Sequence, residues 1–326
     1  MDMKALVLLS IGLDSTLAVK LILDQGIDVL GINFNSPFHI SRKNEAKKVA
    51  KKLKIPLKTM NLGKYYLRVI RNPKHGYGKH MNPCIDCRIF MLKKAKKYAK
   101  EIGASFIFTG EVLGERPMTQ TRENLDLIEK ESGLKRKLLR PLSAKLLPET
   151  EAEKKGWVDR EKLFDIRGRS RKRQIALAKK FKIKEYSAPA GGCLLTYKEF
   201  ADKVRDLFKH KKRVSIKDIK LLKIGRHFRF KKNKIIVGRD EEENKKLLNM
   251  KEKNDFYFEV PGLGSPITIL QGPKTKEAIE KAAKLTDHYS DAKGKKILVK
   301  YGIEKLNKSL SVVSISNKEI KKLRIS

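Results

Sequence analysis

The chain has 326 residues and a mass of 37.4 kDa, a length that favours two domains over one large domain. Apolar residues make up 40% of the sequence, and no run reaches the roughly 18 apolar residues that a membrane helix needs, which argues against a membrane-spanning or a disordered chain. The 76 Lys and Arg residues against 37 Asp and Glu residues give a net charge of +39, far more than solubility requires.

The excess of positive charge is spread along the chain, with about two basic residues for each acidic one on both sides of residue 195. A polyanion is therefore the expected partner, and nucleic acid is favoured over an anionic membrane because no basic amphipathic helix or lipidation signal is present. The three cysteines are an odd number, which argues against a secreted disulfide framework and for a soluble protein in a reducing cytoplasm.

The first half alternates apolar strands with helices. Strands are expected at 5–9, 29–34, 57–61 and 105–109. A turn at 10–14 leads into a first helix that Gly26 closes, and further helices are expected at 44–53 and 89–102. This alternation predicts an α/β fold with a doubly wound parallel sheet, whose ligand site lies at the carboxyl ends of the strands.

The pattern then becomes less regular before it turns β-rich. We expect a helix at 160–166, a second helix after the basic stretch 167–173, a turn at 188–192 and a helix at 197–210. Strands follow at 228–230, 234–237, 256–260, 266–270 and 297–301. The predicted organisation is a Rossmann-like domain over residues 1–195 and a smaller, basic α+β domain over residues 196–326.

The loop after the first strand is a candidate phosphate site, because its backbone N–H groups lie at a helix N-terminus. It reads Ser10-Ile11-Gly12-Leu13-Asp14-Ser15-Thr16 and resembles the pyrophosphate loop of the PP-loop ATP pyrophosphatase family, which cleaves ATP between the α- and β-phosphates. The resemblance implies that these residues bind ATP. Asp14 would assist Mg²⁺ or orient the loop, while the hydroxyls of Ser10, Ser15 and Thr16 would donate to phosphate oxygens. Ile11 stands where the family has glycine, which predicts a modified or weakened ATP site because a β-branched residue resists positive φ.

Two further landmarks follow strands of the same sheet. Asn33 and Phe34 end the second strand, where the family places backbone groups against adenine. The segment Thr109-Gly110-Glu111-Val112-Leu113-Gly114 resembles the signature of tRNA 4-thiouridine synthetases, as does Leu139-Arg140-Pro141-Leu142. This resemblance implies that Thr109, Gly110 and Glu111 border the nucleotide, and that tRNA is the partner.

The cysteines form a Cys-x-x-Cys pair, Cys84 and Cys87, expected just before a helix, and a distant Cys193 in a glycine turn at 191–192. Three thiolates in this arrangement can meet over the crevice. In sulfur-inserting members of the family such a set holds a [4Fe–4S] cluster with one iron open for sulfide, so the resemblance implies this cluster here. The alternatives are a persulfide and resolving-cysteine pair, or a zinc site completed by His80 or His75.

The tail resembles a second family, the RNA-binding domain of NFACT proteins, over about residues 224–301. The resemblance rests on Gly225-Arg226-His227, on the segments 236–240 and 254–258, on Pro261-Gly262-Leu263-Gly264-Ser265-Pro266, and on Ala282-Ala283 and Tyr289-Ser290. The Lys-rich and aromatic-poor composition predicts recognition of RNA by phosphate and shape rather than by base stacking.

Together the motifs predict an ATP-dependent tRNA sulfurtransferase that adenylates a uridine carbonyl oxygen and replaces it with sulfur, using Asp14, Cys84, Cys87 and Cys193. No rhodanese-like segment is evident, so the expected sulfur donor is external, either sulfide or a cysteine desulfurase. The candidate RNA-binding domain follows the ATP domain, whereas 4-thiouridine synthetases carry theirs before it, which leaves the modified position open. The rival functions are a nitrogen-inserting PP-loop enzyme of tRNA modification and a non-catalytic RNA-binding factor.

Overall fold

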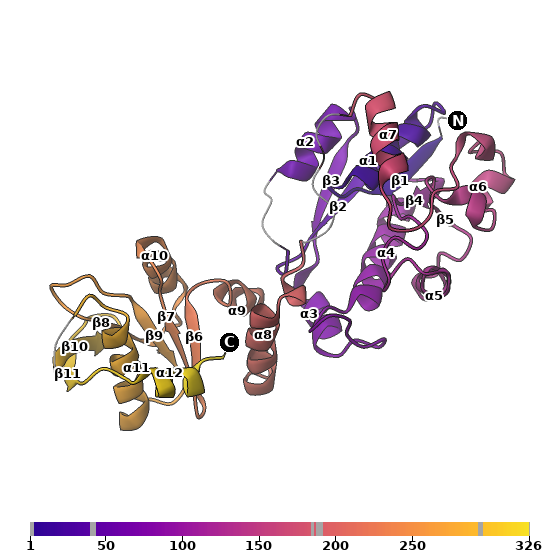
Figure 1. Cartoon of the computed structure of the whole chain (residues 1–326). Coiled ribbons are helices and arrows are strands. Elements are labelled where there is room, and N and C mark those ends of the chain that lie inside the picture. The colour runs from indigo at the N-terminus through magenta and orange to yellow at the C-terminus, as the bar shows by residue number, and fades with distance from the viewer. Residues whose placement is uncertain (1–2, 40–43, 184–185, 187–191, 293–295, 326) are drawn as a thin grey trace. The chain divides into compact units, whose positions relative to one another are not determined.

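The computed structural model describes residues 3–39, 44–183, 186, 192–292 and 296–325. The chain divides into two compact units, Met1–Leu194 (unit 1) and Leu195–Ser326 (unit 2) (Figure 1). Within the described residues, no helix combines the length and the apolar character needed to cross a bilayer.

Unit 1 is built on a five-stranded parallel sheet. Its strands are β1 (Lys4–Leu8), β2 (Asp28–Asn35), β3 (Leu57–Asn61), β4 (Phe106–Phe108) and β5 (Leu138–Leu139). The strand order is β3-β2-β1-β4-β5, so the winding direction reverses between β1 and β4, which pair directly. A doubly wound sheet binds its ligand at such a reversal, beyond the carboxyl ends of the strands. The predicted fold class is confirmed.

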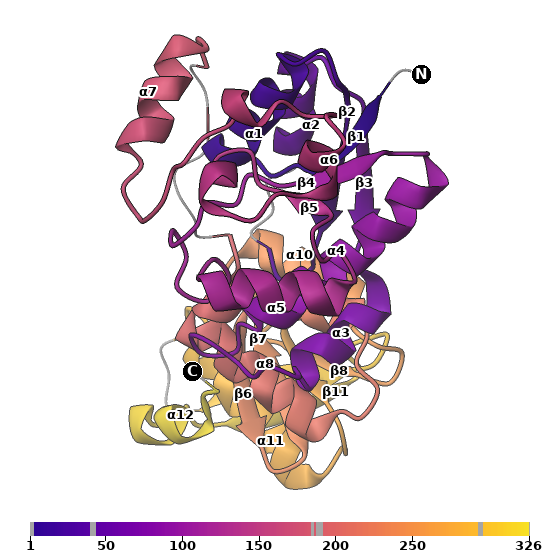
Figure 2. The same ribbon diagram turned by 90° about the vertical axis from the view of Figure 1, so that its right-hand side faces the viewer.

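The helices of unit 1 cover both faces of this sheet. They are α1 (Leu13–Leu23), α2 (Glu45–Lys52), α3 (Gly63–Arg71), α4 (Cys84–Glu101), α5 (Arg122–Ser132), α6 (Glu151–Lys154) and α7 (Lys172–Lys180), with 3₁₀ turns η1 (Ala144–Leu146) and η2 (Arg160–Lys162). Right-handed crossovers place α1 and α2 on one face and α4 and α5 on the other (Figure 1). Helices α3 and α4 pack side by side (Figure 2). Ala5, Val7 and Phe108 are fully buried in the core between the sheet and the helices that cover it.

Three expectations for unit 1 need correction. The helix predicted at 89–102 begins at Cys84, because the carbonyl of Pro83 already accepts a helical hydrogen bond from the N–H of Cys87. The cysteine pair therefore lies in the first helical turn and not ahead of the helix. The helix predicted at 160–166 is only the 3₁₀ turn η2. Helices α3, α5 and α6 and strand β5 were not predicted, although for α5 the signals were present, since Thr121 caps its start and Gly133, with φ of 69°, ends it.

Unit 2 is an antiparallel sheet with helices packed on it. Its elements are α8 (Lys198–His210), α9 (Ile216–Leu221), β6 (Arg226–Phe230), β7 (Asn233–Val237), α10 (Glu241–Met250), β8 (Phe256–Glu259), β9 (Thr268–Gln271), α11 (Lys276–His288), β10 (Ile297–Gly302), β11 (Lys308–Val312) and α12 (Asn317–Leu323), preceded by η3 (Leu194–Thr196). The strand order is β11-β10-β8-β9-β7-β6. All five predicted strands are present, and β11 is an addition.

Helix α8 is fastened to this sheet by a partly buried charge cluster. The carboxylate of Asp206 accepts hydrogen bonds from Nε and Nη2 of Arg229 at 2.9 and 2.5 Å. The ammonium of Lys234 lies 3.9 Å from the same carboxylate, and burial lowers the pKa of Lys234 to about 8. Since the apolar face of α8 is also buried, the residues just before the sheet are an integral part of unit 2.

Candidate nucleotide and thiol site

The loops that follow β1 and β4 touch at the point where the sheet reverses direction. A Cβ atom added to Gly110 would lie only 2.4 Å from the backbone nitrogen of Ser15 and from the carbonyl carbon of Asp14. No side chain fits in that space, so only glycine permits the two loops to approach this closely. The two segments that carried the family resemblance therefore form one site.

The loop after β1 is braced by its own hydroxyl groups. The Ser15 hydroxyl lies within hydrogen-bond distance of the carbonyls of Ser10 and Gly12, at 3.1 and 3.0 Å, and Thr16 donates to the Gly12 carbonyl at 3.2 Å. Ser15 and Thr16 are nearly buried, whereas Ser10 is exposed. The Ser10 hydroxyl lies 2.9 Å from that of Ser15 and accepts a hydrogen bond from the Gly12 N–H at 3.1 Å, so Ser10 is the exposed member of this hydroxyl set.

The substitution at Ile11 does not distort this loop. Ile11 does not adopt a positive φ, and Gly12, the N-cap of α1, has an extended backbone with φ of −83°. The anticipated conflict at Ile11 depended on a left-handed conformation that the loop does not use. The loop keeps a glycine at position 12 for a different reason, since a Cβ there would lie 3.3 Å from the Ser10 hydroxyl oxygen.

Asp14 occupies the first turn of α1 with one oxygen unpaired. Burial raises the pKa of its carboxyl group, and the positive charges of Arg171 and Arg116 oppose that rise. Arg171 Nη2 lies 3.8 Å from Oδ2, too far for a hydrogen bond, and the buried Oδ1 has no hydrogen-bond partner among the described residues. Such an oxygen is suited to a ligand, water or a cation.

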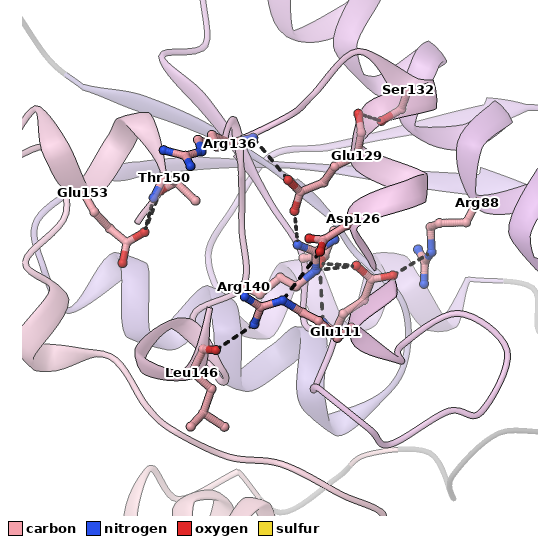
Figure 3. Close-up of polar contacts among 12 residues, drawn as sticks. Arg88, Glu111, Asp126, Glu129, Ser132, Arg136, Arg140, Leu146, Thr150 and Glu153 are labelled. Atoms are coloured by element: carbon pink, nitrogen blue, oxygen red, sulfur yellow. Dashed lines mark hydrogen bonds and ion pairs between the residues drawn. The ribbon is translucent and has the colours of Figure 1, made fainter. Parts of the chain in front are cut away.

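Glu111 is the centre of a buried ion-pair network (Figure 3). Its carboxylate lies 3.0 Å from Arg88 Nε and 3.1 Å from Arg140 Nε, and Thr109 donates to it at 3.1 Å. Glu111 and Arg140 are each only 2% exposed. Burial alone would raise the pKa of Glu111, but the two guanidinium groups outweigh it and hold the pKa below its usual value. The Glu111 side chain thus joins the loop after β4 to α4 and to the end of β5.

The remaining residues predicted to bind nucleotide lie on or beside the strands that carry these two loops. Asn33 donates from its amide to the Leu9 carbonyl at 2.9 Å, which ties the end of β2 to the loop after β1. The side chains of Leu13, Phe34 and Thr109 are buried, so these positions present backbone groups only.

The cysteine pair lies on one side of the first turn of α4. The Tyr66 hydroxyl is 2.9 Å from Cys87 Sγ, and burial of the thiol raises the pKa of Cys87 to about 11. Burial also raises the pKa of Cys84, while a hydrogen bond from Asn82 and the charge of Arg88 oppose the rise. Arg88 therefore borders both the thiols and Glu111.

Cys193 reaches the same neighbourhood from far along the chain. Its backbone pairs with that of His39, and the N–H of Leu194 donates to the Phe38 carbonyl at 2.8 Å. Cys193 Sγ lies 4.0 Å from Asn82 Oδ1, and the thiol interacts electrostatically with Tyr66. The glycine turn expected before Cys193 falls mostly outside the described residues.

The three thiols share neighbours but do not form a metal site. Asn82 interacts with Cys84 and Cys193, and Tyr66 interacts with Cys87 and Cys193. Within the described part of the chain, no group of three or more His, Cys, Asp or Glu side chains is placed to hold a metal ion. Three thiols are suitable ligands for a [4Fe–4S] cluster, but in this structure they are not placed close enough together to hold one.

The zinc alternative finds no support at His75. Its two ring nitrogens lie 3.2 Å from Asp86 Oδ1 and 3.3 Å from Glu131 Oε1. Asp86 also accepts hydrogen bonds from the N–H groups of Lys74 and His75. Asp86, which lies between the two cysteines, thus secures the preceding loop to α4.

Comparison with known families agrees with this geometry. Residues 1–145 match the family of the thiamine biosynthesis protein (ThiI). The match to the ThiI family lies within unit 1. Residues 225–324 match the NFACT protein RNA-binding domain, and this match lies within unit 2. Both resemblances predicted from the sequence are confirmed.

Curated relatives match part of the chain. A probable tRNA sulfurtransferase of Thermococcus kodakarensis is 30% identical over 148 residues, which are 43% of this chain and 36% of that protein. The tRNA-specific 2-thiouridylase MnmA of Syntrophotalea carbinolica is 33% identical over 120 residues, 32% of this chain and 33% of that protein. The chain thus spans about a third of the length of these relatives.

Solved structures were also matched at low overall similarity. A 4-thiouridine synthetase in complex with RNA and ATP gives a TM-score of 0.36 at 22% identity, covering 67% of this chain and 52% of that one. The U34-tRNA thiolase NcsA of Methanococcus maripaludis with its [4Fe–4S] cluster gives a TM-score of 0.35 at 18% identity, covering 64% and 67%.

Several site residues were not predicted from the sequence. They are Tyr66, Asn82, Arg88, Arg171 and Gln174. Arg88 directly follows the Cys-x-x-Cys pair and Asn82 lies two residues before it, and this proximity was the one available signal. The others are separated from the motifs in sequence and join them only through the fold.

We expect Cys87 to be alkylated slowly at neutral pH. With a pKa of about 11, the reactive thiolate is scarce, and the rate should rise about tenfold for each pH unit below that value. Tyr66→Phe should slow the reaction further, because the hydroxyl lowers the pKa of Cys87, whereas Tyr65→Phe on the exposed side of α3 should have no effect. Peptide-resolved mass spectrometry after iodoacetamide labelling measures these rates. Labelling of Cys87 at the rate of an ordinary thiol would contradict the assignment.

Glu111→Ala should destabilise unit 1 by about 3–5 kcal/mol, because it leaves the buried Arg140 without its counter-charge. This loss of unfolding free energy should be complete above the unfolded-state pKa of about 4.3. It should shrink as the pH falls from there through the lower folded-state pKa of Glu111, since the carboxylate stabilises the fold only when ionised. Denaturant unfolding followed by the fluorescence of Trp157, the single tryptophan, reports on unit 1. The exposed Glu101→Ala is the matched control and should stay within about 0.5 kcal/mol.

Proposed function

We propose that the protein is an ATP-dependent tRNA sulfurtransferase that adenylates a uridine carbonyl oxygen and replaces it with sulfur. The observation that carries the proposal is the contact between the two nucleotide-site loops, through Gly110 and Ser15, beside three cysteines in the unit that carries the match to the ThiI family. An RNA-binding domain in the same chain supports a polynucleotide substrate. The curated relatives are named for thiolation of tRNA.

ATP is the proposed first substrate. The uridine oxygen attacks the α-phosphorus, the bond to the β-phosphate breaks, and pyrophosphate leaves. The N–H groups at the start of α1 and the Ser10 hydroxyl stabilise the phosphates. Mg²⁺ would neutralise phosphate charge, and the unpaired oxygen of Asp14 suits it as a ligand.

Sulfur is then delivered to the carbon that carries the adenylated oxygen, and AMP leaves. Sulfide can supply this atom directly. A persulfide on one cysteine can also supply it, if a second cysteine resolves the persulfide and the resulting disulfide is reduced by an external thiol. The sulfur is external in both routes: sulfide supplies the direct route, and a cysteine desulfurase supplies the sulfane sulfur of the persulfide.

A [4Fe–4S] cluster held by Cys84, Cys87 and Cys193 is the finer proposal for the thiol site. The donor set of three thiols supports it, whereas in the described arrangement Tyr66 and Asn82 contact the thiols. The content of metal in the purified protein decides between this proposal and the persulfide route.

Transfer RNA is the proposed polynucleotide. The NFACT-type domain supplies RNA binding, and the positive charge on both sides of residue 195 favours phosphate contacts along the whole chain. Mass spectrometry of tRNA nucleosides from cells with and without the protein separates thiolation from nitrogen insertion. It also separates both from a non-catalytic RNA-binding role, for which no nucleoside would change.

Incubation with ATP, Mg²⁺ and tRNA should yield AMP and pyrophosphate. Asp14→Ala should lower turnover at least 100-fold while tRNA affinity changes less than twofold, because Asp14 contributes little to the basic surface. Asp24→Ala, at the exposed far end of the same helix, should behave like the unaltered chain. Thin-layer chromatography of labelled ATP resolves the products. Formation of ADP and phosphate instead would refute the proposed reaction.

Each of Cys84→Ser, Cys87→Ser and Cys193→Ser should abolish uridine thiolation but leave ATP–pyrophosphate exchange with tRNA intact, because the ATP loops are separate from the thiols. If a cluster is present, protein purified without oxygen should contain about four irons per chain and each variant should lose them. Full thiolation by iron-free protein would overturn the cluster and favour the persulfide route. Loss of exchange in all three variants would contradict the separation of the two sites.

A further inference from the structure

A third segment of unit 1, residues 167–174, borders the nucleotide site, and it lies outside the part that the ThiI family model matches. Its start pairs with the loop after β4, where the backbone of Arg167 lies beside that of Leu113 and the N–H of Gly168 donates to the Leu113 carbonyl at 2.7 Å. This segment therefore runs along the loop whose Gly110 touches Ser15.

Helix α7 continues the segment and is fixed against α1 by apolar packing. Ala178 is buried with Leu13, Leu17 and Leu21 of α1 in one cluster. This packing fixes α7 along α1, and at its start Arg171 Nη2 lies 3.8 Å from Oδ2 of Asp14 in the first turn of α1. The position of Arg171, the N-cap of α7, is thus set by the core.

Polar groups without partners converge at this point. Gln174 is fully buried, and its side chain approaches the Asp14 carboxylate closely enough for a weak hydrogen-bonding contact that lowers the pKa of Asp14, but neither its amide nitrogen nor its amide oxygen makes a hydrogen bond of normal geometry. The buried Nε of Arg171 and Oδ1 of Asp14 are also unpartnered among the described residues. Unpaired buried polar atoms cost folding free energy, and four of them from three neighbouring side chains indicate a place that a ligand completes.

The donors identify the class of ligand. A guanidinium group and an amide N–H beside a helix N-terminus suit an oxyanion, and a guanidinium group binds phosphate through two parallel hydrogen bonds. The 3.8 Å separation between Arg171 and Asp14 is too long for a hydrogen bond, so Arg171 is free to contact an oxyanion without breaking one. Adenine, by contrast, is expected at the end of β2, on the other side of β1.

We propose that Arg171 and Gln174 belong to the same site as the loops after β1 and β4 and bind the phosphate chain of ATP. This inference rests on the proposed function, because it takes the ligand of the crevice to be ATP. It assigns to the ATP site two residues from a segment that carried none of the motifs. Arg171 supplies the charge, and Gln174 supplies a neutral donor that orients the chain beside Asp14.

The test measures equilibrium binding of ATP, pyrophosphate and AMP to the full-length chain by isothermal titration calorimetry. Arg171→Ala should weaken binding of ATP and pyrophosphate at least tenfold and binding of AMP less than twofold, with Arg171→Lys intermediate. Arg173→Ala is the matched control, because Arg173 lies two residues away, is about half exposed and pairs with Asp165 at 2.6 Å. It should change each affinity less than twofold.

Gln174→Met separates binding from folding. Removal of a buried amide that makes no hydrogen bond of normal geometry should leave the thermal unfolding of the ligand-free chain unchanged or raise its midpoint, while ATP binding weakens about fivefold. A Gln174 that only supports the fold would give the reverse, a lower unfolding midpoint with unchanged affinity. Trp157 fluorescence reports the unfolding of unit 1.

Two outcomes overturn the inference in distinguishable ways. If the unaltered chain binds ATP, and Arg171→Ala and Gln174→Met bind it as tightly as Arg173→Ala does, the assignment of these two residues to the ATP site is wrong and the proposed function stands. If the unaltered chain binds neither ATP nor pyrophosphate, the proposed function fails and the inference fails with it. Weakened tRNA binding by Arg171→Ala with unchanged ATP affinity would assign Arg171 to RNA and also overturn the inference.

Discussion

The carboxylate of Glu111 is the charge on which the geometry of unit 1's site depends. Removing this carboxylate and the guanidinium of Arg140 from water is costly for each group alone, and each offsets the cost of the other. Arg88 adds a second guanidinium from the turn that carries the cysteines. The loop after β4, the end of β5 and the start of α4 are therefore held in one register by electrostatics, and apolar packing alone would not specify it.

The residues of this site fall into two groups, which differ in whether their polar atoms have partners within the protein. Glu111 is held by ion pairs with Arg88 and Arg140 and by a hydrogen bond from Thr109, and the hydroxyls of Ser15 and Thr16 are paired within the loop. Asp14 and the start of α7 keep unpaired atoms beside this paired network. The stability of the paired network offsets the free-energy cost of the unpaired polar atoms. This arrangement is common where a charged ligand binds.

Strands and motif loops were predictable because they produce local signals. Apolar runs such as that of β1 predict buried strands, and the glycines of the two loops mark positions where backbones approach closely. The pairing of Arg88 with Glu111, by contrast, has no periodic or local signature in a chain with 76 basic residues. The start of α4 was misplaced because Cys, Asp and a preceding Pro read as a loop. The convergence of the cysteines was expected, but the presence of Tyr66 and Asn82 among them depends on α3 and on tertiary packing that overrides local propensity.

The backbone contacts of Cys193 and Leu194 with His39 and Phe38 have a consequence for the order of folding. They join the last residues of unit 1 to the end of its second strand, a closure across most of the unit's sequence. Synthesis proceeds from the N-terminus at about 5–20 residues per second, so the sheet strands and both nucleotide loops leave the ribosome several seconds before Cys193 does. A nascent chain thus has both loops of the proposed nucleotide site before it has the full set of thiols, and the proposed sulfur transfer must wait for the end of the domain.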